Sequence, residues 1–206
     1  HARSTEKKND ESEYARNLAQ ELKLDLEIIE PDNNDFLRNL EKVVKLQEEP
    51  FGSPAIFMQF IIFENAKKSG IKVMLDGQGG DETLLGYEKY FPAYFREILR
   101  KKGIFSMLKE IFFANRNNDK MSFLETMKFI FGTSSPLIRK KVYRKRAFFM
   151  KNYIDDFGFL HEFATAYSDV KSLQKLEIEK TMLPELLRYE DKNSMYNSIE
   201  SRLPFL

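Results

Sequence analysis

The stretch that decides the fold is residues 73–87, which read Val-Met-Leu-Asp-Gly-Gln-Gly-Gly-Asp-Glu-Thr-Leu-Leu-Gly-Tyr. Its first residues belong to a short apolar run over residues 71–75, which only Lys72 interrupts. Such a run predicts a buried strand. The strand is expected to stop at Asp76, where a glycine-rich loop opens. With the elements expected before it, this strand completes a helix–strand–helix–helix–strand order, which predicts a piece of a parallel α/β sheet.

Three glycines and two carboxylates follow the predicted strand. Glycines allow backbone N–H groups to turn toward one point, and the resulting concavity suits phosphate oxygens. Carboxylates beside it would repel phosphate unless a divalent cation lies between them. The pattern therefore predicts a magnesium–polyphosphate site, and the alternative is a plain turn followed by a helix that Asp81 caps. The residues concerned are Gly77, Gly79, Gly80, Asp81 and Glu82.

A second group of motifs lies at the end of the chain. Residues 183–195 read Leu-Pro-Glu-Leu-Leu-Arg-Tyr-Glu-Asp-Lys-Asn-Ser-Met, and residues 198–206 read Ser-Ile-Glu-Ser-Arg-Leu-Pro-Phe-Leu. Together with the glycine-rich loop, these motifs resemble the synthetase domain of the glutamine-hydrolysing asparagine synthetase family. The matches span residues 48–90 and 183–206. Two separated motifs in the right order are more specific than either one alone.

The resemblance implies a reaction. Synthetase domains of this family bind Mg·ATP and activate a carboxylate as its acyl-adenylate, with release of pyrophosphate. Ammonia from a glutaminase half of the same enzyme then gives the amide and AMP. The implied fold is a helix-wrapped parallel sheet of the adenine nucleotide α-hydrolase kind.

The resemblance also implies roles for individual residues. Asp81 would bind Mg²⁺, and the catalytic group would consist of Gln78, Asp191 and Lys192. The residues implied to bind ATP are Asp76, Gly77, Gly79, Gly80 and Glu82. Gln78 stands where asparagine synthetases carry Glu, and an amide cannot hold a proton as a carboxylate does. This leaves the acceptor open between aspartate and another carboxylate, such as a uronic acid of a glycan.

Composition excludes several classes of protein. The 206 residues have a net charge of +1, which gives no general reason to bind nucleic acid. No stretch approaches the roughly 20 apolar residues needed to cross a bilayer, and the polar first residues do not resemble a secretory signal. The chain has no cysteine, which excludes disulfides and thiolate metal sites and is weakly in favour of a cytoplasmic location.

Hydrophobic periodicity predicts an α/β portion over residues 1–90 and a helical portion over residues 91–206 of one partial synthetase domain. Residues 25–30 are strand-like, and no convincing strand follows residue 76. Gly103 and Pro184 are among the residues expected to interrupt helices. The predicted helices cover residues 11–22, 35–48, 54–69, 97–102, 105–115, 122–131, 137–150, 160–167 and 170–182.

Two parts of the family pattern are missing from this sequence. It contains no Ser-Gly-Gly-x-Asp-Ser phosphate loop, and no glutaminase half with a cysteine nucleophile. We therefore expect a fragment of a larger enzyme that is inactive by itself and needs the glutaminase domain as its partner. The alternatives are a related amidotransferase of glycan or natural-product biosynthesis, and a non-catalytic helical interaction module.

Overall fold

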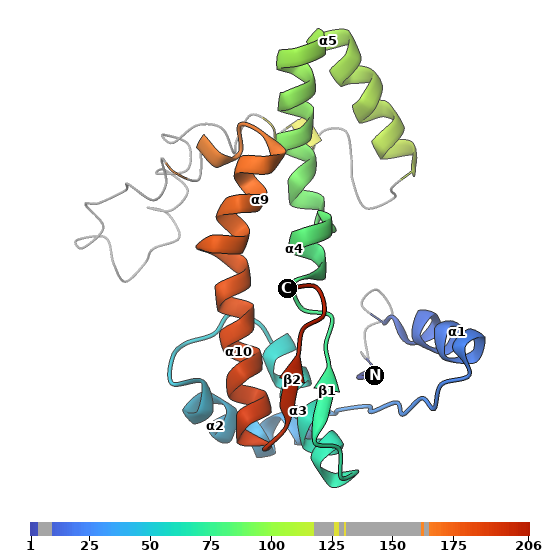
Figure 1. Ribbon diagram of the computed structural model, residues 1–206, viewed down its shortest axis with the longest axis vertical. Helices are drawn as coiled ribbons and strands as arrows, with labels where there is room; N and C mark the ends of the chain where they lie inside the picture. The colour runs from blue at the N-terminus through green and yellow to red at the C-terminus, as the bar shows by residue number, and fades with distance from the viewer. Residues whose placement is uncertain (4–9, 118–125, 128–129, 131–161, 163–164) are drawn as a thin grey trace, which may run out of the picture. The chain divides into compact units, whose positions relative to one another are not determined.

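The structure is a computed structural model that describes residues 1–3, 10–117, 126, 127, 130, 162 and 165–206 (Figure 1). The helix predicted over residues 137–150 lies outside these residues, as do most of the residues of the helix predicted over 122–131 and half of those of the helix predicted over 160–167. The described residues are mostly helical with a small parallel sheet, so the predicted α/β class is confirmed. They form two compact units, residues 1–78 with 185–206 and residues 79–184.

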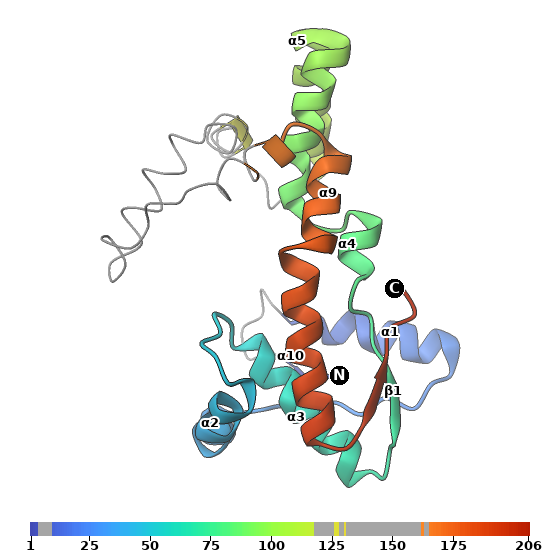
Figure 2. The same cartoon turned by 60° about the vertical axis from the view of Figure 1, so that its left-hand side comes forward.

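The first unit contains the sheet. Strands β1 (Val73–Leu75) and β2 (Glu200–Arg202) are parallel, with Met74 opposite Ser201. Figure 2 shows the two strands side by side, next to the C-terminal part of α10. The helices of this unit are α1 (Ser12–Leu22), α2 (Asn33–Gln47), α3 (Ala55–Lys68) and residues 185–196 of α10 (Met182–Tyr196).

Three predictions about strands were wrong. β1 is not buried, because Val73 and Leu75 are 42% and 72% exposed and only the opposite face, with Met74, packs on the core. β2 lies well after residue 76, and its polar residues carry no alternating apolar pattern that would have predicted it. The strand expected over residues 25–30 is reduced to a single bridge between Ala2 and Ile29.

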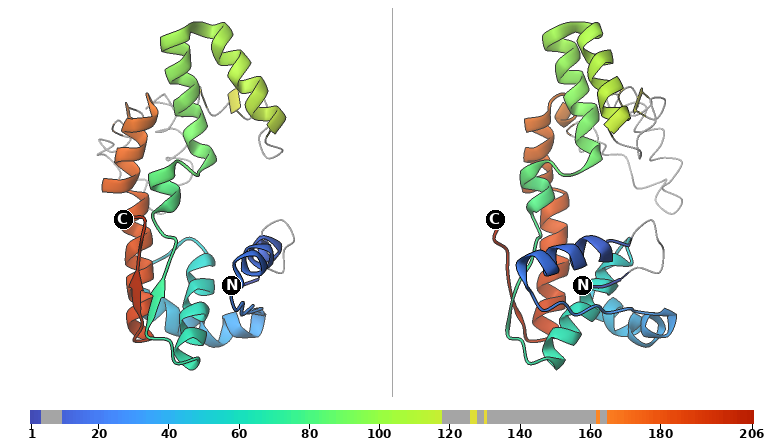
Figure 3. Two further views of the ribbon diagram at one scale, coloured as in Figure 1. Left: turned by 45° about the vertical axis from the view of Figure 1, so that its right-hand side comes forward. Right: turned by 90° about the vertical axis from the view of Figure 1, so that its right-hand side faces the viewer.

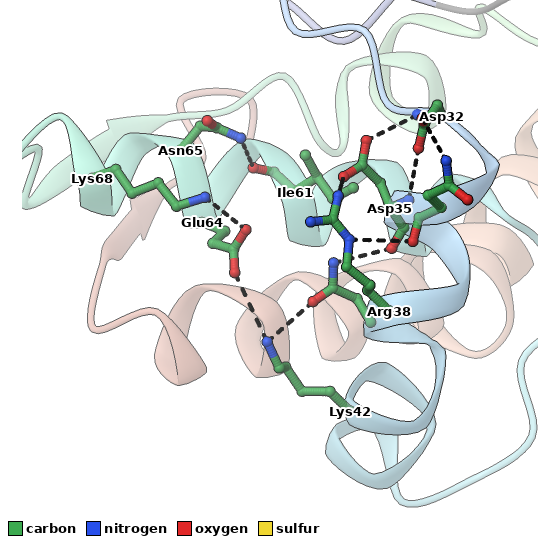
Figure 4. A network of polar contacts seen from close by, with 10 residues as sticks. Asp32, Asp35, Arg38, Lys42, Ile61, Glu64, Asn65 and Lys68 are labelled. Carbon is green, nitrogen blue, oxygen red and sulfur yellow. Dashed lines mark hydrogen bonds and ion pairs between the residues drawn. The ribbon is translucent and has the colours of Figure 1, made fainter.

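The predicted helices of the first unit are confirmed within one or two residues of their ends. Helix α2 begins with a capping box, in which Asp32 accepts from the backbone N–H of Asp35 at 2.8 Å and Asp35 accepts from that of Asp32 at 3.0 Å. Figure 4 shows this cap and the ion pair of 3.8 Å between Lys42 of α2 and Glu64 of α3. The cap thus fixes the start of a helix that packs on α3.

A buried amide connects three helices inside the first unit. Asn193 of α10 is fully buried and accepts from Gln47 of α2 at 2.9 Å. Its Nδ2 donates to the carbonyl of Ile56 at 3.1 Å and to Gln59 Oε1 at 2.9 Å, both on α3. The same three helices also contribute an apolar cluster, which consists of Val43, Ile56, Phe57, Phe60, Ile61 and Tyr189.

The second unit is helical in its described residues. Its elements are α4 (Gly80–Leu84), the 3₁₀ turn η2 (Glu88–Tyr90), α5 (Phe91–Asn117) and α9 (Val170–Glu179). Gly103 interrupts α5 with a φ of +83°, as its place in the sequence predicted. Figure 3 shows the two arms of α5 on either side of this bend, and their side chains share one core, with Phe95 and Ile98 on one arm and Met107 and Ile111 on the other.

Pro184 does not interrupt a helix, contrary to the prediction. It is the third residue of α10, in the first turn, where the backbone N–H has no partner within the helix. Proline is tolerated there because the hydrogen bond that it removes would not exist anyway.

Asn193→Ala is expected to lower the free energy of unfolding by about 2–3 kcal/mol, since it leaves the buried amide of Gln47 without its acceptor. Asn65→Ala is the matched control, because the side chain of Asn65 donates to the carbonyl of Ile61 on its own helix. Urea denaturation measures both changes. Equal losses for the two variants would contradict a special role of Asn193.

Candidate functional site

The glycine-rich loop joins a strand to the start of a helix, as the sequence predicted. Strand β1 ends at Leu75, and the N–H of Asp76 still donates to the carbonyl of Arg202 at 2.9 Å. Gly79 has a φ of +84° and is the N-cap of α4, which begins at Gly80. Asp81 is therefore not the N-cap, so the alternative that it caps this helix is wrong. Convergence of the loop N–H groups on one point stays a prediction.

Asp81 lies in the first turn of α4 with an exposed side chain. The N–H of Gly86 donates to its carbonyl at 2.8 Å and closes the helix. A Cβ atom on Gly86 would lie 2.0 Å from Asp81 Oδ1 and 3.2 Å from its Cα. The glycine before Tyr87 is thus needed to leave room for the Asp81 carboxylate.

Glu82, by contrast, is buried at 1% exposure in the second unit. The Tyr87 hydroxyl donates to Glu82 Oε1 at 2.8 Å, and burial together with this carboxylate raises the pKa of Tyr87. Gln174 of α9 donates to the carbonyls of Glu82 and Thr83, both at 2.9 Å. These contacts hold the short helix that carries Asp81, so Glu82 has the position of a supporting residue.

A salt bridge continues the same polar cluster. Lys89 Nζ lies 2.6 Å from Glu177 Oε2 of α9 and 4.5 Å from the centroid of the Tyr87 ring. Burial, followed by the charge of Glu177, raises the pKa of the neighbouring Tyr90 to about 12. Among the described residues, the Tyr90 hydroxyl is buried without a hydrogen-bond partner.

In the first unit, Asp76 and Gln78 line one cavity of about 1130 Å³. Both follow the carboxyl end of a parallel strand, which is where ligands bind in open α/β sheets. Polar groups from other elements also face the cavity. Its lining consists of His1, Ala2, Arg3, Pro31, Asp32, Asn33, Phe36, Ser53, Pro54, Ala55, Phe57, Met58, Gln59, Ile62, Asp76 and Gln78.

Asp191 and Lys192, the other two predicted catalytic residues, lie on α10 and are not part of this lining. Lys192 Nζ lies 2.5 Å from Glu48 Oε2, and this hydrogen bond lowers the pKa of Glu48. Asp191 is exposed, and its carbonyl accepts from Ser194 Oγ at 3.0 Å. The first unit therefore contains all four residues but brings only Asp76 and Gln78 to one cavity.

The sequence reasoning missed Glu190, which precedes Asp191 on α10. Its side chain is 1% exposed, Ser201 Oγ of β2 donates to its Oε1, and its Oε2 has no partner among the described residues. Burial and the nearby charge of Asp76 raise its pKa to about 7, although the Ser201 bond opposes this. The sequence carried no signal for this role, because the surroundings of Glu190 come from β2 and Asp76, which are not its neighbours along the chain.

The comparison with known proteins agrees with the motifs. The model of the family described as "Asparagine synthase" matches residues 2–206. The chain belongs to the asparagine synthase family. No solved structure matches it.

Three relatives illustrate this asparagine synthase family membership. "Asparagine synthetase [glutamine-hydrolyzing] 1" of Bacillus subtilis is 26% identical over 195 residues, which cover 87% of this chain and 29% of the relative. A putative asparagine synthetase of Mycobacterium bovis is 26% identical over 191 residues, which cover 84% of this chain and 28% of the relative. A putative asparagine synthetase of Methanocaldococcus jannaschii is 34% identical over 67 residues, which cover 32% of this chain and 13% of the relative. The chain spans less than a third of the length of these relatives.

The described residues lack both a preformed metal cage and a membrane-spanning helix. They contain no group of three or more His, Asp or Glu side chains placed to hold a metal ion. Within the same part of the chain, no helix is both long enough and apolar enough to cross a membrane.

Gly86→Ala is expected to displace the Asp81 carboxylate and to lower the free energy of unfolding by about 1–2 kcal/mol, because the new Cβ overlaps Asp81 Oδ1. Gly52→Ala is the control, since a Cβ there meets nothing within 4 Å. Chemical denaturation measures both. If Gly86→Ala proved as harmless as Gly52→Ala, the packing of Asp81 against Gly86 would be wrong.

Glu190→Gln is expected to flatten the dependence of stability on pH. The folded pKa of about 7 exceeds the usual 4.5, so the folded state keeps a proton that the unfolded chain loses between these values. The stabilisation by this proton is complete below about pH 4.5 and is lost as the pH rises through 7, with an upper limit of about 3 kcal/mol. Urea denaturation at pH 5 and pH 8 measures the change in the free energy of unfolding between these pH values. An equal change in wild type and variant would refute the prediction.

Proposed function

We propose that the chain is part of the synthetase domain of an ATP-dependent amide-forming ligase. The enzyme adenylates a carboxylate, for which we favour aspartate, and amidates it with ammonia from glutamine to give asparagine, AMP and pyrophosphate. The chain by itself is inactive, because it spans less than a third of its relatives. A glutaminase domain outside this sequence supplies the ammonia.

The observation that carries this proposal is the position of the glycine-rich loop. Asp76 and Gln78 line a cavity beyond the carboxyl end of β1, and Gly79 turns the chain into α4. Gly77 and Gly80 keep the backbone of this loop free of side chains, so that N–H groups can approach phosphate oxygens. We accordingly assign the fold to the adenine nucleotide α-hydrolase kind, as one partial domain with an α/β portion over residues 1–90 and a helical portion over 91–206.

The donor set permits Mg²⁺ but is not a preformed cage. Asp81 is exposed and accommodated by Gly86, whereas Glu82 is occupied by Tyr87. Mg²⁺ commonly binds through one or two carboxylates together with substrate phosphates, so Asp81 alone meets the requirement when ATP is present. Bound there, Mg²⁺ would neutralise charge that develops on the leaving pyrophosphate.

The residues of this chain have separate tasks in the proposal. The loop N–H groups orient the phosphates, and Glu82 holds α4 so that Asp81 is preorganised. Gln78 contacts the substrate at the cavity. Asp191 and Lys192 complete the catalytic group from α10, with Lys192 held by Glu48 in the present structure. If Lys192 turned toward the substrate, its ammonium group would leave the carboxylate of Glu48 and pair with the carboxylate of the substrate.

Gln78 also favours a second candidate within the same reaction class. The amide of Gln78 cannot take up a proton as a carboxylate would. The carboxylate substrate that is amidated can therefore differ from aspartate. The second candidate is an amidotransferase that acts on a carboxylate of a glycan or natural product. Pyrophosphate release tested with aspartate and with uronic acids separates the two.

Asp81→Ala in the full-length protein is expected to lower kcat/KM for pyrophosphate release by about 10² to 10³, because it removes a charged group that acts on the leaving phosphates. The exposed side chain makes the expected change in stability less than about 0.5 kcal/mol. A coupled pyrophosphate assay and chemical denaturation measure the two effects.

Glu88→Ala is the control, since Glu88 is an exposed carboxylate seven residues further along the chain. It should leave turnover unchanged. Wild-type turnover in Asp81→Ala would remove the metal role, and a failure of the full-length protein to release pyrophosphate with any carboxylate would remove the proposed function itself.

A further inference from the structure

Three side-chain amides, of Gln47, Asn193 and Gln59, form a hydrogen-bonded chain from the core of the first unit to the cavity. We propose that Gln59 is a substrate-binding residue whose side-chain NH₂ group donates to an acceptor atom of the bound substrate. Asn193 is the positioning residue that fixes the NH₂ group of Gln59 in this orientation. The inference rests on the proposed function, because it treats the cavity as the substrate site.

The first step of the argument is the orientation of the Asn193 amide, which is fully buried. One end of this amide lies 3.1 Å from the carbonyl oxygen of Ile56, and a carbonyl oxygen only accepts hydrogen bonds. The atom at this end must therefore be Nδ2, which leaves Oδ1 to accept from Gln47 Nε2 at 2.9 Å. A reversed amide would place two oxygens against each other at Ile56, so only one orientation is satisfied.

The second step concerns the amide of Gln59 on α3. Asn193 Nδ2 carries a second N–H, which donates to Gln59 Oε1 at 2.9 Å. If the Gln59 amide were reversed, two NH₂ groups would face each other, and a donor of the buried Asn193 would lose its acceptor. Such a loss is costly, so the side chain of Gln59 keeps its oxygen toward Asn193 and its nitrogen away from it.

The third step is the position of the Gln59 nitrogen. Gln59 is half-buried and lines the same cavity as Asp76 and Gln78. Its Nε2 has no hydrogen-bond partner among the described residues, and it is not one of their buried polar atoms that lack a partner. This nitrogen is therefore an accessible donor at the wall of the cavity, with its N–H groups unused by the described part of the chain.

The residues that line the cavity beside this donor on α3 are apolar, namely Ala55, Met58 and Ile62. Pockets of this kind orient a ligand by a few placed polar groups, because a polar atom of the ligand that found no partner there would lose its hydration. The ligand atom that meets Gln59 must accept a hydrogen bond. It is an oxygen or ring nitrogen of the nucleotide, or an oxygen of the carboxylate substrate. Because Asn193 already holds Gln59, little side-chain freedom is lost when the substrate binds.

Two variants of the full-length protein test the donor by the kinetics of pyrophosphate release. Gln59→Met keeps the length of the side chain and removes the donor, so KM for one substrate should rise about fivefold. Gln59→Glu keeps an oxygen for Asn193 but turns a second oxygen toward the substrate, so the rise should reach about thirtyfold. In both variants kcat should change less than about twofold, because the contact is already made with the bound substrate. Gln20→Glu, at an exposed glutamine of α1, is the matched control and should keep both KM values.

The source of the acceptor atom is decided by measuring KM for Mg·ATP and for the carboxylate separately, each with the other substrate saturating. A larger rise for Mg·ATP assigns the acceptor atom to the nucleotide, and a larger rise for the carboxylate assigns it to that substrate. Unchanged KM values in Gln59→Glu would overturn the proposal. Equal rises in the two values would also overturn it, because they would indicate a general disturbance of the cavity and not the loss of one contact.

A double-mutant cycle tests whether Asn193 acts through Gln59. Asn193→Ala should raise the same KM about threefold in the wild-type background and leave it unchanged in Gln59→Met, where no NH₂ group remains to be positioned. Equal rises in both backgrounds would refute the positioning role, since a purely structural effect does not depend on residue 59. If Asn193→Ala does not fold, the two Gln59 variants still decide whether the donor binds substrate.

Failure of the proposed function can be distinguished from failure of this inference. If no carboxylate supports pyrophosphate release, the proposed function fails, and calorimetric titration of the full-length protein with Mg·ATP replaces the kinetics. Weaker binding of Mg·ATP by Gln59→Glu than by wild type and Gln20→Glu would then still support the contact of Gln59. Equal binding by all three proteins, or no binding by wild type, would overturn the inference as well.

Discussion

The first unit depends on the side-chain amide of Asn193. With its two donors and one acceptor oxygen engaged, this group ties α10 to α2 and α3 in a region that excludes water. Buried hydrogen bonds add little net stability when they are complete but are costly to break, so they specify one arrangement of the helices more than they strengthen it. The position of α10 in turn determines where Glu190 meets β2.

The two halves of the glycine-rich motif, residues 76–78 and residues 79–82, are held in place by different contacts. Asp76 and Gln78 owe their position to the strand pairing of β1 with β2, since the ladder extends to the N–H of Asp76. Asp81 owes its position to contacts inside the second unit, from Gly86 and through Glu82. One continuous sequence motif is therefore held by two independent sets of contacts, and a substitution that disturbs one set can leave the other intact.

Much of the local structure could be predicted from the sequence. The apolar stripes of α1 and α2, the glycine break in α5 and the loop after β1 depend on neighbouring residues, and each left a pattern that could be read. Strand β2 could not be predicted, because Glu-Ser-Arg becomes a strand only by pairing with residues far away in the chain. The same reason concealed Glu190, whose chemistry arises from Ser201 and Asp76 and not from its neighbours in sequence.

The order of the strands along the chain has a topological consequence. β1 and β2 are hydrogen-bonded neighbours, yet the whole second unit lies between them in sequence, entered after Gln78 and left after Pro184. The entropy of closing such a loop grows only with the logarithm of its length, so lengthening or shortening the inserted segment costs the strand pairing little. The inserted segment can therefore change in length and sequence while the register of the two strands is kept. Such changes would also alter the surroundings of the loop that leads into the segment.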